Sequence, residues 1–323
     1  MIRVAVDAMG GDRGPEAVVE GALAVRDAGI VPVIFGAADL DTQGLELVAT
    51  TQVVGMDEKP ADVLRSKEES SLVRAVKAVA DGEADAVVSP GNTGAMLAAG
   101  LVYVRRITGV RRPAIAVPIP AKNGPCVLVD VGANADCRPE HLLQFATMGA
   151  VFAEEILGIA RPQVRLLSIG EEAEKGNQLT LQAHALLAAS DLDFRGNAEG
   201  RDILDGAADV LVTDGFTGNV ALKTVEGTIR TVLGGLRSEI EATAGGKLGG
   251  LLIRPAARRL RSRLDPDTYG GAYLLGLRGL VVIAHGNSSS TAIANAIRLA
   301  ARGVEHDVVG RLAARLSVQP ETV

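Results

Sequence analysis

Hydrophobic positions along the chain form short continuous runs, each closed by a Gly, Asn or Asp cluster and followed by a longer segment with helical spacing. This alternation predicts a largely parallel α/β sheet, because uninterrupted apolar strands are typical of sheets covered by helices on both faces. The expected strands are residues 2–6, 31–35, 86–88, 114–117, 127–131, 164–169, 210–212 and 280–284. The expected helices are residues 15–28, 70–80, 93–104, 139–157, 177–189, 219–240, 288–302 and 306–316. No linker or internal repeat interrupts this pattern, so we expect a single domain over residues 1–323.

The segment from Gly245 to Arg263 has a different pattern. Its apolar side chains recur every four residues while its arginines fall on another face, which predicts a basic amphipathic helix inside an inserted segment of residues 241–270. The apolar positions include Leu252 and Leu260, and the basic positions include Arg254 and Arg258. Two interpretations follow: the helix packs on its own domain with solvated arginines, or it lies on anionic lipid or an acidic partner protein.

Composition excludes several function classes. The 323 residues carry 33 Lys plus Arg against 39 Asp plus Glu, a formal charge of -6, with 2% aromatic residues and no Trp. A mildly acidic chain without stacking aromatics is not expected to bind nucleic acid. The two cysteines suit a reducing cytosol, and no apolar run approaches the ~18 residues that span a bilayer. We therefore expect a cytoplasmic protein that is at most membrane-associated.

Glycine and asparagine recur together at five turns between expected strands and helices. These turns are Gly91-Asn92, Gly132-Ala133-Asn134, Gly176-Asn177, Gly218-Asn219 and Gly286-Asn287. In a parallel sheet such turns share the carboxyl edge, where open α/β folds bind ligands. Glycine lets the backbone approach a ligand, and helix N-termini and Asn side chains donate hydrogen bonds to anions. A single pair usually serves only a turn with positive φ, but five on one edge indicate a phosphate site.

Two of these loops lead from a strand into an apolar helix and are the main candidates for phosphate binding. Their candidate residues are Gly91, Asn92, Thr93 and Gly94 in the first loop, and Gly286, Asn287 and Ser288 in the second. We expect Thr93 to cap its helix. His285 precedes the second loop and is a candidate general acid or phosphate contact, although a single His at a strand end is more often structural.

Charged side chains also stand at strand ends. Asp7, Asp130 and Asp214 could bind a metal, orient a base or hold loop amides. Their spacing resembles no dedicated metal site, so we expect neither a metal nor another cofactor. Lys175 lies among three glutamates and can supply the positive charge that a phosphate or an oxyanion requires, if it points to the edge. Cys137 is the only candidate covalent nucleophile.

Three common catalytic or nucleotide-binding motifs are absent from the sequence. It contains no G-x-x-x-x-G-K-[ST], no G-x-G-x-x-G in its first loop and no G-x-S-x-G. Their absence disfavours Walker-type ATP use and a hydrolase nucleophile elbow, and it weakens an interpretation based on NAD binding.

Taken together, the motifs resemble one family over nearly the whole chain, in the family's order. They are residues 4–12 (VAVDAMGGD), 91–95 (GNTGA), 129–134 (VDVGAN) with 138–141 (RPEH), 169–177 (IGEEAEKGN), 196–202 (GNAEGRD), 214–219 (DGFTGN) and 285–286 (HG). This set closely resembles the bacterial phosphate acyltransferase family, the acyl-ACP:phosphate transacylases of phospholipid synthesis. Arg13-Gly14 stands where Asn-Ala is more usual, and Asn287 where a Ser commonly follows His-Gly.

The resemblance implies a Rossmann-like three-layer α/β/α sandwich of the isocitrate and isopropylmalate dehydrogenase type. It implies transfer of a long-chain fatty acyl group from acyl carrier protein to inorganic phosphate. The acyl phosphate formed would then be consumed by a glycerol 3-phosphate acyltransferase. It also implies a homodimer and peripheral contact with the anionic inner face of the cytoplasmic membrane.

Phosphate is the nucleophile of such a reaction, so no covalent enzyme intermediate is required. We expect the phosphate to be held by Asn92, Thr93, Asn287 and Ser288. Lys175 and Asn219 are expected to stabilise negative charge, and His285 to donate or relay a proton. The loops are expected to be oriented by Asp7, Asp130, Asn134 and Asp214. Two alternatives stay open. A dehydrogenase of the isopropylmalate type shares the architecture, and a non-catalytic lipid-surface scaffold would use the basic helix alone.

Overall fold

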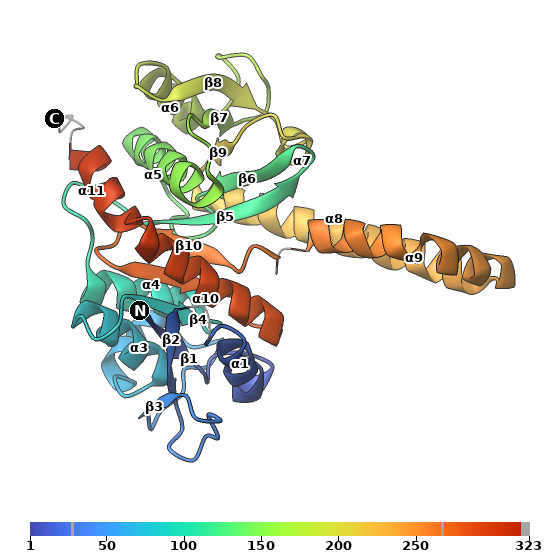
Figure 1. Ribbon diagram of the computed structural model, residues 1–323. Coiled ribbons are helices and arrows are strands. Elements are labelled where there is room, and N and C mark those ends of the chain that lie inside the picture. The colour runs from blue at the N-terminus through green and yellow to red at the C-terminus, as the bar shows by residue number, and fades with distance from the viewer. Residues whose placement is uncertain (27–28, 266–267, 318–323) are drawn as a thin grey trace.

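The computed structural model describes residues 1–26, 29–265 and 268–317, and it confirms the expected α/β fold class (Figure 1). Its centre is one sheet of 11 strands in the order β3-β2-β1-β4-β11-β10-β5-β6-β9-β7-β8. The strands are β1 (Ile2–Asp7), β2 (Ile30–Gly36), β3 (Glu46–Ala49), β4 (Ala86–Ser89), β5 (Ala114–Ala121), β6 (Gly124–Val129), β7 (Gln163–Leu167), β8 (Asp193–Ala198), β9 (Val210–Val212), β10 (Ala272–Leu275) and β11 (Leu280–Ile283).

Helices cover both faces of the sheet and complete three layers. They are α1 (Gly14–Leu23), α2 (Pro60–Ser66), α3 (Ser71–Ala80), α4 (Thr93–Ala99), the π-helix η1 (Gly100–Val104), α5 (Pro139–Leu157), α6 (Gln178–Ala188), α7 (Asp202–Asp205), α8 (Gly215–Ala242), α9 (Ala244–Leu264), α10 (Ser290–Glu305) and α11 (Val308–Ser317). Helices α1, α5, α6, α10 and α11 contribute to one hydrophobic core, and α2, α3, α4, α7 and the first half of α8 to the other.

The sheet consists of two parallel groups that run in opposite directions. Strands β1, β2, β3, β4 and β11 pair in parallel, as do β6, β7, β8 and β9. Between the groups, β10 is antiparallel to both β11 and β5, and β5 is antiparallel to β6. Three successive reversals leave the carboxyl ends of the two groups at opposite edges of the sheet.

This topology corrects the expectation that the five Gly-Asn turns share one edge. The turns at Gly91 and Gly286 follow β4 and β11, whereas those at Gly132, Gly176 and Gly218 follow strands of the other group. The expectation failed because an apolar run predicts a strand without giving its direction. Strands β3, β8 and β10 and the short helices α2 and α7 were also not predicted.

Several helix boundaries differ from the expectation. Helix α1 ends at Leu23, five residues early, and residues 27–28 of the expected helix lie outside the described residues. The expected helix over 93–104 changes from α4 into the π-helix η1 at Gly100. Helix α8 begins at Gly215 rather than at residue 219, because the Asp214 side chain caps it there.

Helix α9 confirms the helix expected between Gly245 and Arg263, but its surroundings differ from those of a helix packed on its own domain. It folds back along α8, and together they form a hairpin that projects from the body of the molecule (Figure 1). We call residues 228–264 the arm. No residue of α9 is buried, and the Leu252 side chain is 80% exposed. Among the described residues, none of the helices combines the length and apolar character that crossing a membrane requires.

Candidate active site

The carboxyl ends of β1, β4 and β11 form one edge of the sheet, which we call the first edge. There a buried carboxylate connects the loops that follow β1 and β4. The Asp7 carboxylate accepts hydrogen bonds from the Met9 backbone N–H (3.1 Å) and the Ser89 hydroxyl (2.7 Å). The Ser89 Oγ in turn accepts one from the Gly91 N–H (3.0 Å). Asp7 is fully buried, and this burial raises the pKa of its carboxyl group, while hydrogen bonds from Ser71 and Ser89 oppose the increase. The two loops therefore share one fixed anchor.

A third loop, after β11, joins them. The Asp12 N–H donates to the Gly286 carbonyl oxygen (2.7 Å), and the Arg13 Nε donates to Asn287 Oδ1 (2.8 Å). A Cβ atom at Gly10 would lie 2.7 Å from the Cα of Gly91, which is closer than real side chains allow. The structure thus brings together the two expected phosphate loops, at Gly91 and Gly286, and adds the loop after β1.

Asn92 serves as a local anchor in this arrangement. Its Oδ1 accepts the Ala95 N–H (3.0 Å), so Asn92 and not Thr93 caps α4, and Thr93 is the first helical residue. Its Nδ2 donates to the backbone carbonyls of Gly55, Met56 and Glu58. A phosphate contact through the Asn92 side chain would require breaking these bonds, so the donors that this loop leaves for an anion are the backbone N–H groups of residues 93 and 94 and the hydroxyl of the exposed Thr93.

The loop before α10 holds the candidate general acid. The Ser289 hydroxyl caps α10 by accepting the Ala292 N–H (3.2 Å). Ser288 is buried, with 4% of its surface exposed, and its N–H donates to the His285 carbonyl (3.0 Å). The His285 side chain is 42% exposed. The ring is therefore open to a substrate, whereas Ser288 is mainly part of the loop's interior.

The carboxyl ends of β6, β7 and β9 form the opposite edge, which we call the second edge. There the Asp130 carboxylate holds the loop after β6. It accepts the backbone N–H groups of Ile115, Gly132, Ala133 and Asn134 at 2.8 to 3.2 Å, and the Asn134 Nδ2 at 2.9 Å. Burial raises the pKa of Asp130, and these hydrogen bonds oppose the increase. Such contacts are those of a carboxylate that fixes a loop.

The start of α8 packs on this loop. The Gly215 N–H donates to the Asn134 carbonyl (2.8 Å), and Asp214 caps the helix by accepting the Thr217 N–H (2.9 Å) and hydroxyl (2.8 Å). A Cβ atom at Gly132 would lie 3.9 Å from the Asn219 side chain. The structure therefore places Asn134, Asp214 and Asn219 together.

Lys175 follows β7, the strand next to β9 in the sheet, and so lies at the same edge as Asn219. Its N–H closes a turn with the Glu172 carbonyl (3.0 Å), and its own carbonyl accepts the Ser168 hydroxyl (2.9 Å). The residue is exposed. The backbone of the loop is thus fixed while the ammonium group is accessible to an anion.

Cys137, the only candidate for a covalent nucleophile, lacks the surroundings that activate a thiol. Its thiol faces the Asn134 carbonyl (3.6 Å), and burial, with the nearby Asp130 carboxylate, raises its pKa to about 12. The reactive thiolate is therefore scarce at neutral pH. Within the described residues, no group of three or more His, Cys, Asp or Glu side chains could hold a metal ion.

Helix α8 connects the two edges. Glu226 follows Asn219 by seven residues, which places it roughly 10 Å further along the helix axis on nearly the same flank. Its Oε1 lies 3.5 Å from Nε2 of His285, which belongs to the first edge. Glu226 belongs to none of the sequence motifs, because its spacing to Asn219 is informative only when α8 is known to reach the loop after β11.

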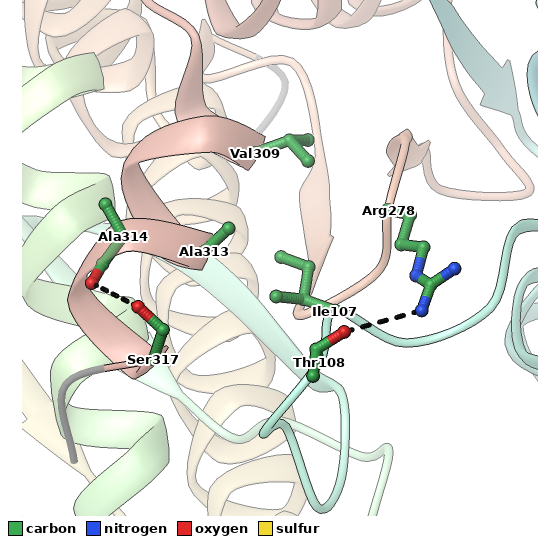
Figure 2. Close-up of a pocket in the computed structure, with 7 residues that line it drawn as sticks. All are labelled: Ile107, Thr108, Arg278, Val309, Ala313, Ala314 and Ser317. Atoms are coloured by element: carbon green, nitrogen blue, oxygen red, sulfur yellow. Dashed lines mark hydrogen bonds between the residues drawn. The ribbon is translucent and has the colours of Figure 1, made fainter.

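Two pockets lie away from the candidate site residues. One, of about 460 Å³, lies between α11 and the segment after η1, and Figure 2 shows the Arg278 guanidinium directed at the Thr108 hydroxyl beside it. The other, of about 1480 Å³, is lined by α5, α6 and α11. Neither contains an expected site residue, so the candidate site lies outside both of them.

The mixed sheet with helices on both faces is a fold that solved phosphotransacetylases share. A phosphotransacetylase of Streptococcus pyogenes has the same fold, with a TM-score of 0.63, 19% identity and 94% of each chain covered. A 4-hydroxythreonine-4-phosphate dehydrogenase of Klebsiella pneumoniae also shares the fold, with a TM-score of 0.55, 14% identity, and coverage of 94% of this chain and 100% of the other.

Sequence comparison identifies the family among proteins of this fold. A family model described as "Fatty acid synthesis protein" matches residues 2–311. A phosphate acyltransferase of Heliobacterium modesticaldum is 43% identical over 334 residues, covering 100% of both chains. One of Desulforudis audaxviator is 46% identical over 319 residues, covering 97% of this chain and 95% of the relative. The chain belongs to the phosphate acyltransferase family, which confirms the resemblance and identifies an acyltransferase enzyme instead of the dehydrogenase or scaffold alternatives.

The contact between Gly218 and the Asp130 loop predicts a position-specific glycine requirement in α8. A Cβ atom at Gly218 would lie 1.9 Å from the Asp130 carbonyl oxygen. We expect Gly218→Ala to lower the free energy of unfolding by about 1 to 3 kcal/mol or more, because the helix start must shift. The measurement is urea unfolding followed by circular dichroism.

Gly227 is the matched control in the same helix. A Cβ atom there meets nothing within 4 Å, so Gly227→Ala should raise stability by about 0.5 to 1 kcal/mol. Equal unfolding free energies for the two variants would contradict the packing described for the start of α8.

Proposed function

We propose that this protein transfers a long-chain fatty acyl group from acyl carrier protein to inorganic phosphate, forming an acyl phosphate. A glycerol 3-phosphate acyltransferase is then the downstream partner that consumes the product in phospholipid synthesis. The observation that carries the proposal is the match, over nearly the whole chain, to relatives named phosphate acyltransferase.

The reaction makes three demands on the site. A phosphate oxygen attacks the thioester carbonyl carbon, the resulting tetrahedral oxyanion must be stabilised, and the C–S bond breaks with a thiolate as the leaving group. The thiolate requires a proton. Backbone N–H groups, neutral amides, one ammonium group and an imidazole meet these demands without a cofactor.

The loops divide these tasks between the two edges. At the first edge, the N–H groups at the starts of α4 and α10 and the Asn287 amide support phosphate binding, and the exposed His285 ring supports proton transfer. To Lys175 and Asn219, at the second edge, we assign the stabilisation of the oxyanion. Asp7, Asp130, Asn134 and Asp214 hold the loops through the hydrogen bonds described above.

Exposed apolar side chains near Asn219 suit a fatty acyl substrate. Phe216 is 66% exposed in the first turn of α8, and Val220, one turn later, is 52% exposed. Ile169, at the start of the loop that carries Lys175, is 81% exposed. Exposed apolar groups that cluster beside polar candidates favour an amphipathic substrate over a purely polar one.

The arm supports contact with an anionic membrane surface. Helix α9 contains Lys and Arg at six positions and no acidic residue: Lys247, Arg254, Arg258, Arg259, Arg261 and Arg263. Large apolar side chains near its start are exposed, namely Leu248, Leu251, Leu252 and Ile253. A helix of this kind binds anionic lipid through apolar burial and charge attraction. We further propose a homodimer that associates peripherally with the inner face of the cytoplasmic membrane.

The activity itself is tested with palmitoyl-acyl carrier protein and inorganic phosphate. We expect the carrier thiol to be released only when phosphate is present, and the acyl phosphate to be trapped as a hydroxamate with hydroxylamine. Release without phosphate would indicate a thioesterase, and no release would contradict the proposed transfer.

Lys175 should be needed for turnover and not for folding. Because it is expected to stabilise the oxyanion, Lys175→Ala should lower kcat by about 100-fold or more in the thiol-release assay. Lys122→Ala, which removes an exposed lysine from the turn between β5 and β6, is the control and should retain wild-type turnover. Unchanged kcat in Lys175→Ala would remove this residue from the mechanism.

The exposed leucines of the arm should be needed for membrane contact. Leu252→Glu with Leu260→Glu should abolish sedimentation with phosphatidylglycerol vesicles, because charges replace the apolar contact, while circular dichroism stays unchanged. Val102→Glu, at an exposed valine of η1, is the control and should still sediment. Equal binding by the double variant and the control would assign lipid contact to another surface.

A further inference from the structure

We propose that Glu226 is the positioning residue of His285, holding its imidazole in place and stabilising the protonated ring while a proton passes to the leaving thiolate. The inference rests on the proposed function. It adds a group that the sequence motifs do not contain and links the two edges of the sheet in one catalytic step.

Among the described residues, only one of the two carboxylate oxygens of Glu226 accepts a hydrogen bond. Its side chain is 14% exposed, and Oε2 accepts a hydrogen bond from Lys223 Nζ (2.9 Å). Within the described part of the chain, the buried Oε1 has no hydrogen-bond partner, although Nε2 of His285 lies only 3.5 Å away. Leaving a buried carboxylate oxygen unpaired is costly, so a small movement of the ring that closes this gap is favourable.

The surroundings of His285 leave Glu226 as its nearest charged partner. The Arg13 side chain is bonded to Asn287, and the Asp12 carboxylate faces the backbone at Gly286. Lys223 holds the other oxygen of Glu226, so Oε1 remains for the imidazole. A carboxylate that engages one ring nitrogen fixes the ring orientation and leaves the other nitrogen for the substrate.

The proton balance of the transfer gives this pair a defined task. As an oxygen of hydrogen phosphate bonds to the thioester carbon, its proton passes to Nδ1 of His285, while Nε2–H donates to Glu226. When the C–S bond breaks, the Nδ1 proton passes to the thiolate sulfur. The products are the acyl phosphate and the free thiol, and no proton is gained or lost. The carboxylate stabilises the imidazolium formed between the two steps.

Helix α8 makes the arrangement possible. It carries Asn219 and Glu226 on nearly the same flank, so the oxyanion candidate and the His285 partner are held by one rigid element. Because the oxyanion oxygen and the leaving sulfur are bonded to the same carbon, the Asn219 amide and the His285 ring have to reach one tetrahedral centre from two positions along the helix.

The test compares kcat of Glu226→Gln in two backgrounds, in the palmitoyl-carrier protein and phosphate assay. In the wild-type background we expect kcat to fall by about 100-fold with KM for phosphate changed less than about threefold, because Gln keeps the volume but not the charge. In a His285→Ala background the same substitution should cause no further loss, since residues that act as a unit are not additive. Glu226→Asp, which keeps the carboxylate, should recover part of kcat.

Glu305→Gln is the control, because Glu305 is an exposed glutamate at the end of α10 and lies outside the arm, and it should retain wild-type kcat. Urea unfolding of each variant separates loss of folding from loss of chemistry, and Glu226→Asp carries the test if the Gln variant unfolds. Wild-type kcat in Glu226→Gln, or an equal loss in both backgrounds, would overturn the inference while leaving the transfer reaction intact. A wild-type protein without phosphate-dependent thiol release would instead overturn the proposed function, and the inference with it.

Discussion

The antiparallel pairing of β10 and β5 between two parallel groups of strands is the constraint on which the rest of the structure depends. It places the carboxyl ends of the two groups at opposite edges, so the glycine loops form two clusters instead of one. A substrate that must meet both clusters cannot lie in one crevice at a single edge. The candidate site therefore has to be built along an element that runs from one edge toward the other.

Helix α8 is that element. Its first turns pack against the Asp130 loop through Gly215 and Gly218, where the backbones approach too closely for any side chain. Two turns later the same helix places Glu226 beside His285. Beyond that point it leaves the body and continues into the arm, where α9 has no buried residue. One helix thus carries the residue proposed to stabilise the oxyanion, the proposed partner of His285 and the proposed membrane contact.

Buried carboxylates give the two clusters their rigidity. Asp7 and Asp130 each lie at the end of a central strand and accept hydrogen bonds from loop N–H groups. Burial disfavours their charged forms, and the hydrogen bonds offset part of that cost. Loops held in this way can present backbone N–H groups to an anion without ordering at the moment of binding, which is the preorganisation that stabilising a developing charge requires.

The sequence by itself determined the α/β class, most strands, the helix over 139–157, the basic helix and the family, because apolar runs, helical spacing and loop motifs are local properties. It also identified Lys175, Asn219 and His285 as candidates. Only the tertiary structure decided strand direction, the capping of α4 by Asn92, the projection of the arm and the approach of Glu226 to His285. These depend on hydrogen bonds and packing between segments far apart in the chain, which no local pattern encodes.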